Sequence, residues 1–526
     1  MRRGVGMARV CGLGPVLFLA LALAVSACAP ASRPAPPRPV ATPLPDEARD
    51  LTGLPQDLLP YLDPRTLDAP IIPQATQAQA HERFRQQHFS PWGRTAASYS
   101  RQEALWGLAH LKRNKHYGEN LRLLGPKFRA DMEWLAQAET YPNAALPAIA
   151  TANTALRVVP TSRPGFLKPT DPGEGYPFDY WQNSGVWAGT PMLVTQVSRD
   201  GAWALVETRF AGGWVRMGDI ALVDQAFMDR WASLPLLAVT TERTPIAGLP
   251  EGEGDTVGMA ASEPGTFLFH GRIGTVLPLS GEDEGGYTAL APVRGADGRA
   301  LIASVRLGRD QAAPMPLAPT PRNFALLVGQ MLGQPYGWGG YLDNRDCSAL
   351  MLDIYAPFGI FLPRNSRQQS RAGDQLPLAG LAPEEKERTL LDKGVPLMTL
   401  IHKPGHIMLY IGRGTGPNVG RAMMLHAIWG LKTLDEEGRA GRFVVGRTAI
   451  TTLEPGAEIP AVARAGTLLP TFDTFTFVVP GLAPAIPAAS ATPKPQPAPP
   501  SQPRENGGQP GSGQTSGQET CPNPAQ

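Results

Sequence analysis

The chain has 526 residues, enough for about three or four domains, because single hydrophobic cores rarely grow beyond about 250 to 300 residues. Its 48 basic and 46 acidic residues leave a formal net charge of +2, so no strong overall field attracts nucleic acid, and we expect no nucleic-acid partner. Glycine (57) and proline (56) are both frequent, which favours linkers and short-stranded β domains.

The N-terminus is predicted to be an export and lipidation signal. Arginines near the start precede an apolar stretch, residues 10–25, as in a secretory signal peptide. The stretch ends in Val-Ser-Ala-Cys, which resembles the bacterial lipobox, so residues 1–27 are expected to be removed and Cys28 to be lipidated. The alternative is an ordinary signal peptide. Ala29 does not resemble an inner-membrane retention signal, so we expect a protein of the bacterial cell envelope, anchored in the outer membrane and facing the periplasm.

Composition and periodicity then divide the chain into segments. Residues 28–50 contain PAPPRP and are predicted to form a proline-rich linker. Helical periodicity predicts a small helical domain over residues 51–150. Near Thr151 the pattern changes to short strands separated by turn residues. The glycine pair and tryptophan of AGGWVRMGDIAL resemble bacterial SH3-like barrels, so residues 151–234 and 235–315 are predicted as a first and a second SH3-like domain.

Only one of the four cysteines lies in a segment that is predicted to remain and to fold. Cys11 lies in the signal peptide and Cys28 is the expected lipidation site. Cys521 lies in residues 481–526, which are rich in Pro, Ser, Gln and Gly and are predicted to be a disordered tail. A disulfide framework is therefore not expected, and Cys347 is the candidate for chemistry.

The residues around Cys347 predict a thiol at the start of a helix. Asp346 is a suitable N-cap, and the apolar residues that follow at helical spacing are Leu350, Met351 and Ile354. The unpaired N–H groups and the dipole at a helix N-terminus favour an anion, so the sequence predicts a stabilised thiolate at Cys347. The alternative is a small buried hydrophobic residue.

Two downstream histidines are candidates for a base and its orienting partner. GHIMLYIG carries His406 and AMMLHAIW carries His426, and both alternate as strands around the turn-rich RGTGPNVG, which predicts an antiparallel hairpin. In a hairpin the residue numbers of two opposed positions add up to a nearly constant sum, which is set by the centre of the turn. His406 and His426 are almost equally far from the centre of this loop, so they are predicted to face each other within about one residue. His402 precedes a Pro-Gly pair and is predicted to lie in a loop. A zinc site built from Cys347, His406 and His426 is an alternative by ligand type.

Five motifs follow one another in the C-terminal part of the chain: PYGWGG, DCSAL, LPRNSRQQ, GHIMLYIG and LHAIWG. In this order they resemble the catalytic domain of NlpC-type cell-wall cysteine peptidases. The resemblance predicts a peptidase domain with a papain-like α+β fold over residues 316–480. ERFRQQHFSPW and NTALRVVPT resemble the lipoprotein branch of this family, in which a helical clip domain and two SH3-like domains precede the catalytic domain.

The resemblance implies roles for individual side chains in catalysis. Cys347 resembles the nucleophile, His406 the general base and His426 the residue that orients His406. Tyr336 resembles a tyrosine whose hydroxyl group supports the site near the thiol. No metal and no cofactor is expected.

The resemblance also implies substrate contacts. Asp346 and Ser348 resemble residues that bind the free amine of an N-terminal L-alanine. Trp338 is expected to contact the substrate, and Tyr180 from the first SH3-like domain is expected to close that end of the cleft. The sequence departs from the family at Ala349, where glycine is usual, and we expect the extra methyl group to narrow the cleft.

The implied reaction is hydrolysis of the bond between γ-D-glutamate and a diamino acid in peptidoglycan peptides, through a thioester on Cys347. The expected partners are peptidoglycan-derived peptides and, through lipidated Cys28, the membrane. One alternative is a non-catalytic cell-wall-binding scaffold lipoprotein that uses its SH3-like domains. Another is acyl transfer by the same thioester chemistry.

Overall fold

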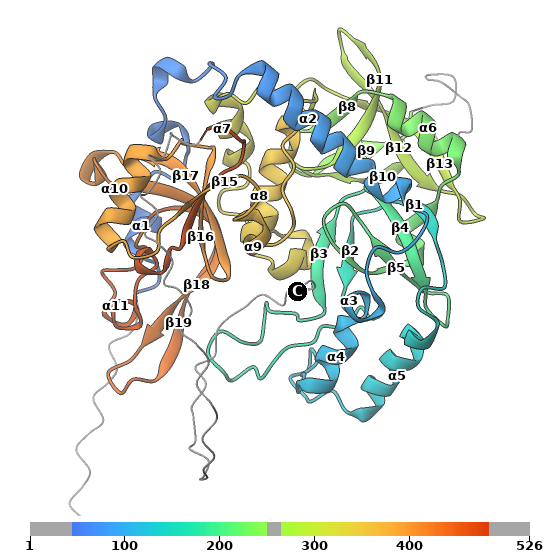
Figure 1. The fold of residues 1–526 in the computed structure, drawn as a ribbon, viewed down its shortest axis with the longest axis horizontal. Coiled ribbons are helices and arrows are strands. Elements are labelled where there is room, and N and C mark those ends of the chain that lie inside the picture. Colours follow the sequence, from blue (N-terminus) through green and yellow to red (C-terminus); the bar gives the residue numbers. More distant parts are fainter. Residues whose placement is uncertain (1–44, 250–264, 483–526) are drawn as a thin grey trace, which may run out of the picture. The chain divides into compact units, whose positions relative to one another are not determined.

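The structure is a computed structural model that describes residues 45–249 and 265–482 (Figure 1). The predicted signal peptide, Cys28, most of the predicted linker and nearly all of the predicted tail lie outside the described residues. Within the described residues, no helix combines the length and the apolar character needed to cross a membrane. The architecture is multidomain, with a helical N-terminal region, small antiparallel-sheet domains and a C-terminal domain of helices around a sheet, as the sequence predicts.

The N-terminal region is helical. Its helices are α1 (Arg49–Gly53), α2 (Gln74–Phe89), α3 (Arg101–Ala104), α4 (Trp106–Arg113) and α5 (Pro126–Ala136). In Figure 1, α2 runs beside both the C-terminal domain and the second sheet domain. The Gln77 amide donates to the carbonyl of Leu317 at 2.6 Å, and the Arg85 guanidinium donates to the carbonyl of Ala232 at 2.7 Å. One helix of this region therefore holds two other domains together.

The first sheet domain is a seven-stranded antiparallel sheet in the order β3-β2-β6-β5-β4-β1-β7. Its strands are β1 (Leu146–Ala150), β2 (Thr154–Arg157), β3 (Gln182–Val186), β4 (Pro191–Val197), β5 (Trp203–Glu207), β6 (Gly212–Arg216) and β7 (Ile220–Leu222). The sheet starts before residue 151, because β1 pairs with both β4 and β7. Trp214, in the motif that resembles an SH3-like barrel, is 1% exposed and packs in a core.

The second sheet domain combines a five-stranded sheet, in the order β13-β12-β11-β8-β14, with the pair β10-β9. Its strands are β8 (Leu236–Val239), β9 (Thr244–Ala247), β10 (Phe267–Gly271), β11 (Val276–Asp283), β12 (Gly286–Arg294), β13 (Ala300–Leu307) and β14 (Ala312–Pro314). Helix α6 (Gln225–Ser233) connects the two sheet domains. Its Phe227 and Trp231 pack in the same core as Leu237, Phe269 and Val305.

The C-terminal domain is built on a six-stranded antiparallel sheet in the order β15-β20-β16-β17-β18-β19. Its strands are β15 (Asp374–Pro377), β16 (Thr399–Lys403), β17 (His406–Arg413), β18 (Ala422–Leu434), β19 (Ala440–Thr452) and β20 (Thr474–Phe477). Its helices are α7 (Pro321–Gly329), α8 (Cys347–Tyr355), α9 (Ser366–Gln369), α10 (Pro383–Lys393) and α11 (Pro460–Ala465). Helix α7 starts at Pro321, a position where proline is favoured because the first turn of a helix leaves the backbone N–H unpaired.

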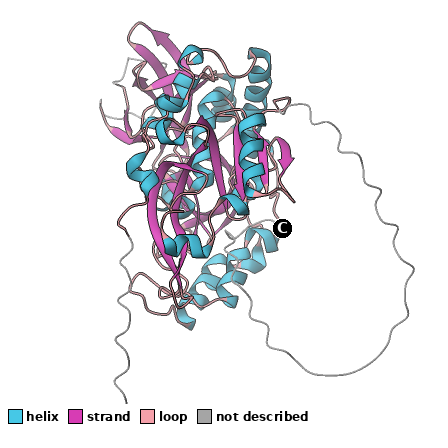
Figure 2. Ribbon diagram, turned by 90° about the vertical axis from the view of Figure 1, so that its left-hand side faces the viewer, coloured by secondary structure: helices cyan, strands magenta, loops and turns pink. Residues whose placement is uncertain are grey.

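The two faces of this sheet carry different helices (Figures 1 and 2). Helix α8 packs on the face of Ile407 and Leu409, because alternate residues of a strand point to opposite faces. Helix α10 packs on the other face, where Leu390 joins Met408 and Tyr410 in a separate core. The N-terminus of α8 is thereby held close to the first residues of β17.

The N-terminal segment also covers an edge of this sheet. β19 is an edge strand, which would leave backbone groups exposed. The Gln56 side-chain amide forms two 2.9 Å hydrogen bonds with the backbone of Ile450, and the Asp50 carboxylate accepts from the N–H of Thr452 at 2.8 Å. Side chains from the N-terminal segment therefore take the place of a neighbouring strand.

Candidate active site

Cys347 lies at the first position of α8. Asp346 is the N-cap, and its carboxylate accepts from the N–H of Ala349 at 2.8 Å. The backbone N–H of Ile407 in β17 hydrogen-bonds to the Cys347 sulfur, and the side chain is 5% exposed. The thiol thus lies between the start of the helix and the strand residue that directly follows His406.

His406 and His426 are brought together, but not by the predicted register. Leu409 pairs with Leu425, which places Met408 and not His406 opposite His426. The offset arises because Arg413 pairs with Ala422, so the turn is centred later in the chain than the sequence indicated, and a bulge between Tyr410 and Gly412 makes up only one residue of the difference. The two rings meet diagonally across the strands, with His406 Nε2 3.0 Å from His426 Nδ1.

The contacts of His426 continue into β19. His426 is fully buried, and its Nε2 lies 3.2 Å from the Thr451 hydroxyl oxygen. The Thr451 hydroxyl group donates to the carbonyl of Thr452 at 2.8 Å. Sequence reasoning did not single out Thr451, because one threonine in an alternating strand carries no signal of its own.

The pKa values of Cys347 and His406 favour a neutral thiol and a neutral imidazole. Burial, and then the charge of Asp346, raises the pKa of the Cys347 thiol to about 12. Burial, and then the nearby His426 ring, lowers the pKa of His406, and burial lowers the pKa of His426 to about 3. The prediction of a thiolate stabilised in the free enzyme is therefore wrong, because burial outweighs the helix N-terminus. The thiol keeps its proton, and a neutral histidine is in the state that can accept it.

Asp346 and Ser348, the residues predicted to bind the substrate amine, already bind a positively charged side chain. The Arg364 guanidinium donates to both oxygens of Asp346, at 3.0 and 2.7 Å, and to the Ser348 hydroxyl oxygen at 2.9 Å. Although burial opposes ionisation, Arg364 holds the pKa of Asp346 below its usual value. The N–H groups of Gly339 and Ala349 fill the remaining positions around the carboxylate.

This arrangement argues against Asp346 and Ser348 as the first contacts of a substrate ammonium group, because a guanidinium is already bound to both side chains and would repel it. Arg364 belongs to the LPRNSRQQ motif, so the signal was present in the sequence. The sequence did not show which carboxylate this arginine would meet.

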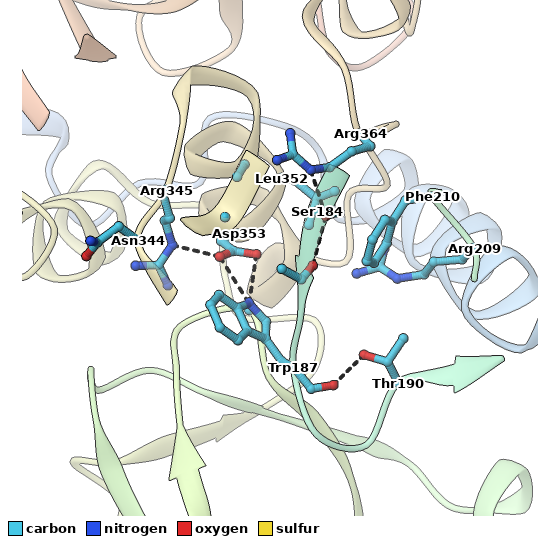
Figure 3. A pocket seen from close by; sticks show the side chains of 14 residues that line it. Ser184, Trp187, Thr190, Arg209, Phe210, Asn344, Arg345, Leu352, Asp353 and Arg364 are labelled. Atoms are coloured by element: carbon cyan, nitrogen blue, oxygen red, sulfur yellow. Dashed lines mark hydrogen bonds and ion pairs between the residues drawn. The ribbon is translucent and has the colours of Figure 1, made fainter. Parts of the chain in front are cut away.

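Ala349 does not face the cleft. It lines a small cavity of about 30 Å³ between β3 of the first sheet domain and α8 (Figure 3). The expectation that its methyl group narrows the cleft is therefore wrong, because the helix turns this position towards β3. The first sheet domain is also tied to α8 here, since the Trp187 Nε1–H donates to Asp353 at 3.1 Å.

Asp353 belongs to a buried ion network behind the nucleophile. Arg345, which is 2% exposed, lies 2.7 Å from the carboxylate of Asp353 and 2.7 Å from that of Glu242 in the second sheet domain. Figure 3 shows Arg345 and Trp187 converging on Asp353. Arg345 is two residues before Cys347, so both sheet domains contribute to the support of the catalytic helix.

The glycines of PYGWGG allow the first sheet domain to approach closely. Gly339 and Gly340 have φ of 58° and 86°, in the left-handed region that favours glycine. A Cβ atom on Gly340 would collide with the backbone of Gly185 in β3. The motif therefore serves the interface between domains as well as the cleft.

The cleft in front of His406 has a volume of about 740 Å³. Its lining includes Tyr336, Trp338, Tyr180, Glu174, Trp429 and Lys403. Tyr180 comes from the first sheet domain, and its hydroxyl group donates to the Glu174 carboxylate at 3.1 Å. The structure thus brings Tyr336, Trp338 and Tyr180 to the same cleft as His406, and it adds an acidic residue that the sequence prediction lacked.

Tyr180 is held between aromatic rings of two other domains. The His110 ring from α4 stacks against it at 5.7 Å and 12°, and the Trp338 ring lies 6.0 Å away on the catalytic side. Phe178, from the same segment, meets Trp338 at 5.1 Å. One end of the cleft is therefore walled by aromatic residues from the first sheet domain.

His402 is not a loop residue. It lies in β16, is 6% exposed, and its Nδ1 is 2.7 Å from the Asp473 carboxylate. The Pro-Gly pair after it forms the turn between β16 and β17 and does not end the strand early. The sequence prediction failed because it treated that turn as an interruption of one strand.

Family models match three parts of the chain. Residues 16–141 match the NLPC_P60 stabilising domain, N term, residues 164–216 match the SH3 domain (SH3b1 type), and residues 333–437 match the NlpC/P60 family. No curated protein matches the chain.

Solved structures with the same fold include an NlpC/P60 endopeptidase from Photobacterium damselae subsp. piscicida. It is 27% identical, with a TM-score of 0.71, and the match covers 81% of this chain and 97% of that one. An NlpC/P60 family protein from Bacillus cereus is 19% identical, with a TM-score of 0.40, and covers 64% of this chain and 100% of that one.

The three matched segments follow the order of the helical region, the first sheet domain and the C-terminal domain. The chain therefore belongs to the NlpC/P60 family, as a peptidoglycan-hydrolysing cysteine endopeptidase in which an N-terminal stabilising domain and SH3-like domains precede the catalytic domain.

Proposed function

We propose that the protein hydrolyses the bond between γ-D-glutamate and a diamino acid in peptidoglycan peptides, with Cys347 as nucleophile. The observation that carries the proposal is the arrangement around the thiol. The N–H of Ile407 contacts the sulfur, and the preceding residue, His406, is hydrogen-bonded to His426 at 3.0 Å. A nucleophile, a base and an orienting group in this order match the requirements of covalent acyl transfer.

The steps of the proposed reaction start from the neutral Cys347 thiol and the neutral His406 ring. His406 takes the thiol proton as the sulfur attacks the γ-carbonyl carbon, because a free thiolate is disfavoured in this buried site. The tetrahedral adduct then collapses to a thioester as the protonated His406 donates its proton to the leaving amine. Water, deprotonated by His406, hydrolyses the thioester, and the thiol recovers its proton.

The walled end of the cleft supports short peptides with a free N-terminus. Tyr180 and Trp338 limit the space at that end, and Glu174 supplies a carboxylate in the same cleft. Because Arg364 neutralises Asp346, we assign the ammonium group of the N-terminal L-alanine to Glu174 and the Tyr180 hydroxyl group. Asp346 and Ser348 then shape the site through Arg364.

A synthetic L-Ala-γ-D-Glu-diaminopimelate tripeptide tests the reaction. Wild type should release L-Ala-D-Glu and diaminopimelate, detected by mass spectrometry, and Cys347→Ala should release neither. No cleavage by wild type would favour a cell-wall-binding scaffold, and cleavage that survives Cys347→Ala would refute the mechanism. Acetylation of the L-alanine amine should abolish turnover, and undiminished turnover would contradict the assigned amine contact.

We also propose that the protein is anchored in the bacterial outer membrane through lipidated Cys28. The proposal rests on the N-terminal sequence, since Cys28 lies outside the described residues. Metabolic labelling with a palmitate analogue should mark wild type and not Cys28→Ala. Equal labelling of both would exclude this residue as the acylation site.

A further inference from the structure

Thr451 occupies a decisive position behind the two histidines. It lies in β19, is 1% exposed, and its hydroxyl oxygen is the atom that faces His426 Nε2, at 3.2 Å. The hydroxyl proton is directed to the carbonyl of Thr452 at 2.8 Å. A hydroxyl group has only one proton to donate, so towards His426 the Thr451 oxygen acts as an acceptor.

This contact fixes the tautomer of His426. Because Thr451 accepts, His426 must carry its proton on Nε2. A neutral imidazole has one protonated nitrogen, so His426 Nδ1 is left as an acceptor. Burial lowers the pKa of both histidines, which keeps each ring in the neutral form to which this reasoning applies.

The tautomer of His406 follows in turn. His426 Nδ1 accepts across the 3.0 Å contact, so His406 must donate from Nε2. The proton of His406 is then on Nε2, and Nδ1 is its one basic nitrogen. With the opposite tautomers, His406 would carry its proton on Nδ1, and its lone pair would face His426 instead of being available to the thiol.

We propose that Thr451 is a positioning residue that sets the tautomers of His426 and His406 and so keeps His406 competent as a base. The inference rests on the proposed cysteine-peptidase mechanism and extends it to a fourth residue. Thr451 acts only through the histidines. A hydroxyl group that already donates to the backbone can hold a neighbouring histidine in one tautomer without adding charge to the buried site.

Thr451→Val tests the proposal, because valine keeps the shape of threonine and removes the hydroxyl group. The buried His426 Nε2–H then loses its acceptor, which favours the other tautomer of both rings. We expect kcat for the tripeptide to fall about 10- to 100-fold with KM nearly unchanged. Thr451→Ser keeps the hydroxyl group and should retain most of the activity. Thr448→Val removes another buried hydroxyl group from β19, where Thr448 pairs with Ala427 and so points to the opposite face of the sheet from His426, and is the matched control.

Tautomers are read directly by long-range ¹H–¹⁵N correlation spectra of protein labelled in its histidines. Wild type should show Nε2–H forms for His406 and His426, and Thr451→Val should shift His426 to the Nδ1–H form. Wild-type kcat in a folded Thr451→Val variant, or unchanged tautomers in it, would overturn the proposal. An equal loss of activity in Thr448→Val would do the same. If wild type does not cleave the peptide, the proposed function fails, while the spectra still test the role of Thr451.

Discussion

Replacing Arg364 by methionine should destabilise the protein and slow its thiol chemistry. Arg364 and Asp346 are each 8% exposed and are joined by two hydrogen bonds, of 3.0 and 2.7 Å. Removing one partner of a buried pair leaves an uncompensated charge, which costs about 3 to 5 kcal/mol. A Coulomb interaction of unit charges at about 4 Å and an effective dielectric constant of about 20 gives about 4 kcal/mol, the same range.

A double-mutant cycle measures this coupling. The unfolding midpoints in urea of wild type, Arg364→Met, Asp346→Asn and the double variant are followed by tryptophan fluorescence. Each single variant should lose several kcal/mol, and the double variant should recover at least about 2 kcal/mol of the summed loss, because no lone charge remains. Free energies that add within about 0.5 kcal/mol would refute the buried-pair reasoning.

The same variants act in opposite directions on Cys347. The charge of Asp346 raises the pKa of the thiol and that of Arg364 lowers it. Alkylation of Cys347 by iodoacetamide, measured on the peptide that contains it, should therefore be faster in Asp346→Asn and slower in Arg364→Met. Equal rates in both variants would show that this pair does not control the thiol.

Three further predictions concern two contacts between domains and one buried histidine. Trp187→Phe removes the N–H donor to buried Asp353 and should lower the unfolding free energy by about 1 to 3 kcal/mol, visible as a lower melting temperature; an unchanged melting temperature would contradict it. Because the His110 ring stacks on Tyr180, His110→Ala should raise KM for the free-amine tripeptide about two- to tenfold with little change in kcat. His110→Phe keeps an aromatic ring and should restore the wild-type KM. Equal KM values in all three proteins would show that His110 does not support Tyr180. Burial lowers the pKa of His116 to about 3, so between pH about 6.5 and 3 the unfolded chain binds a proton that the folded chain does not. Stability should fall as pH drops, by about 1.4 kcal/mol per unit from this residue, and urea midpoints of His116→Phe should fall less steeply than those of wild type; parallel curves would count against it.

Local chemistry made the elements of the site predictable. The N-cap at Asp346, the start of α8 at Cys347 and the strands that carry His406 and His426 each follow from a few neighbouring residues. A helix cap and an alternating strand are set by short-range hydrogen bonds and side-chain direction, so their signals lie in adjacent positions. The multidomain architecture is likewise visible in the changes of periodicity along the chain.

What the sequence could not supply are contacts between distant segments. The partner of Asp346 is Arg364 and that of His426 is Thr451, and neither pairing leaves a mark in local periodicity. The register of the histidine hairpin was missed because the turn is centred later, with Arg413 opposite Ala422, than the composition of the loop indicated. The protonation of Cys347 was missed because burial depends on the packing of the whole domain.

Gln56 and Asp50 of the N-terminal segment bind the backbone of strand β19, and this contact limits which fragments of the protein can be studied alone. A fragment that begins at the catalytic domain would lack both side chains and would present Ile450 and Thr452 as unpaired edge groups. Such a fragment is expected to self-associate through that edge, even though its nucleophile and histidines are all present. The shortest well-behaved version of this enzyme therefore has to begin before Asp50, far upstream of its chemistry.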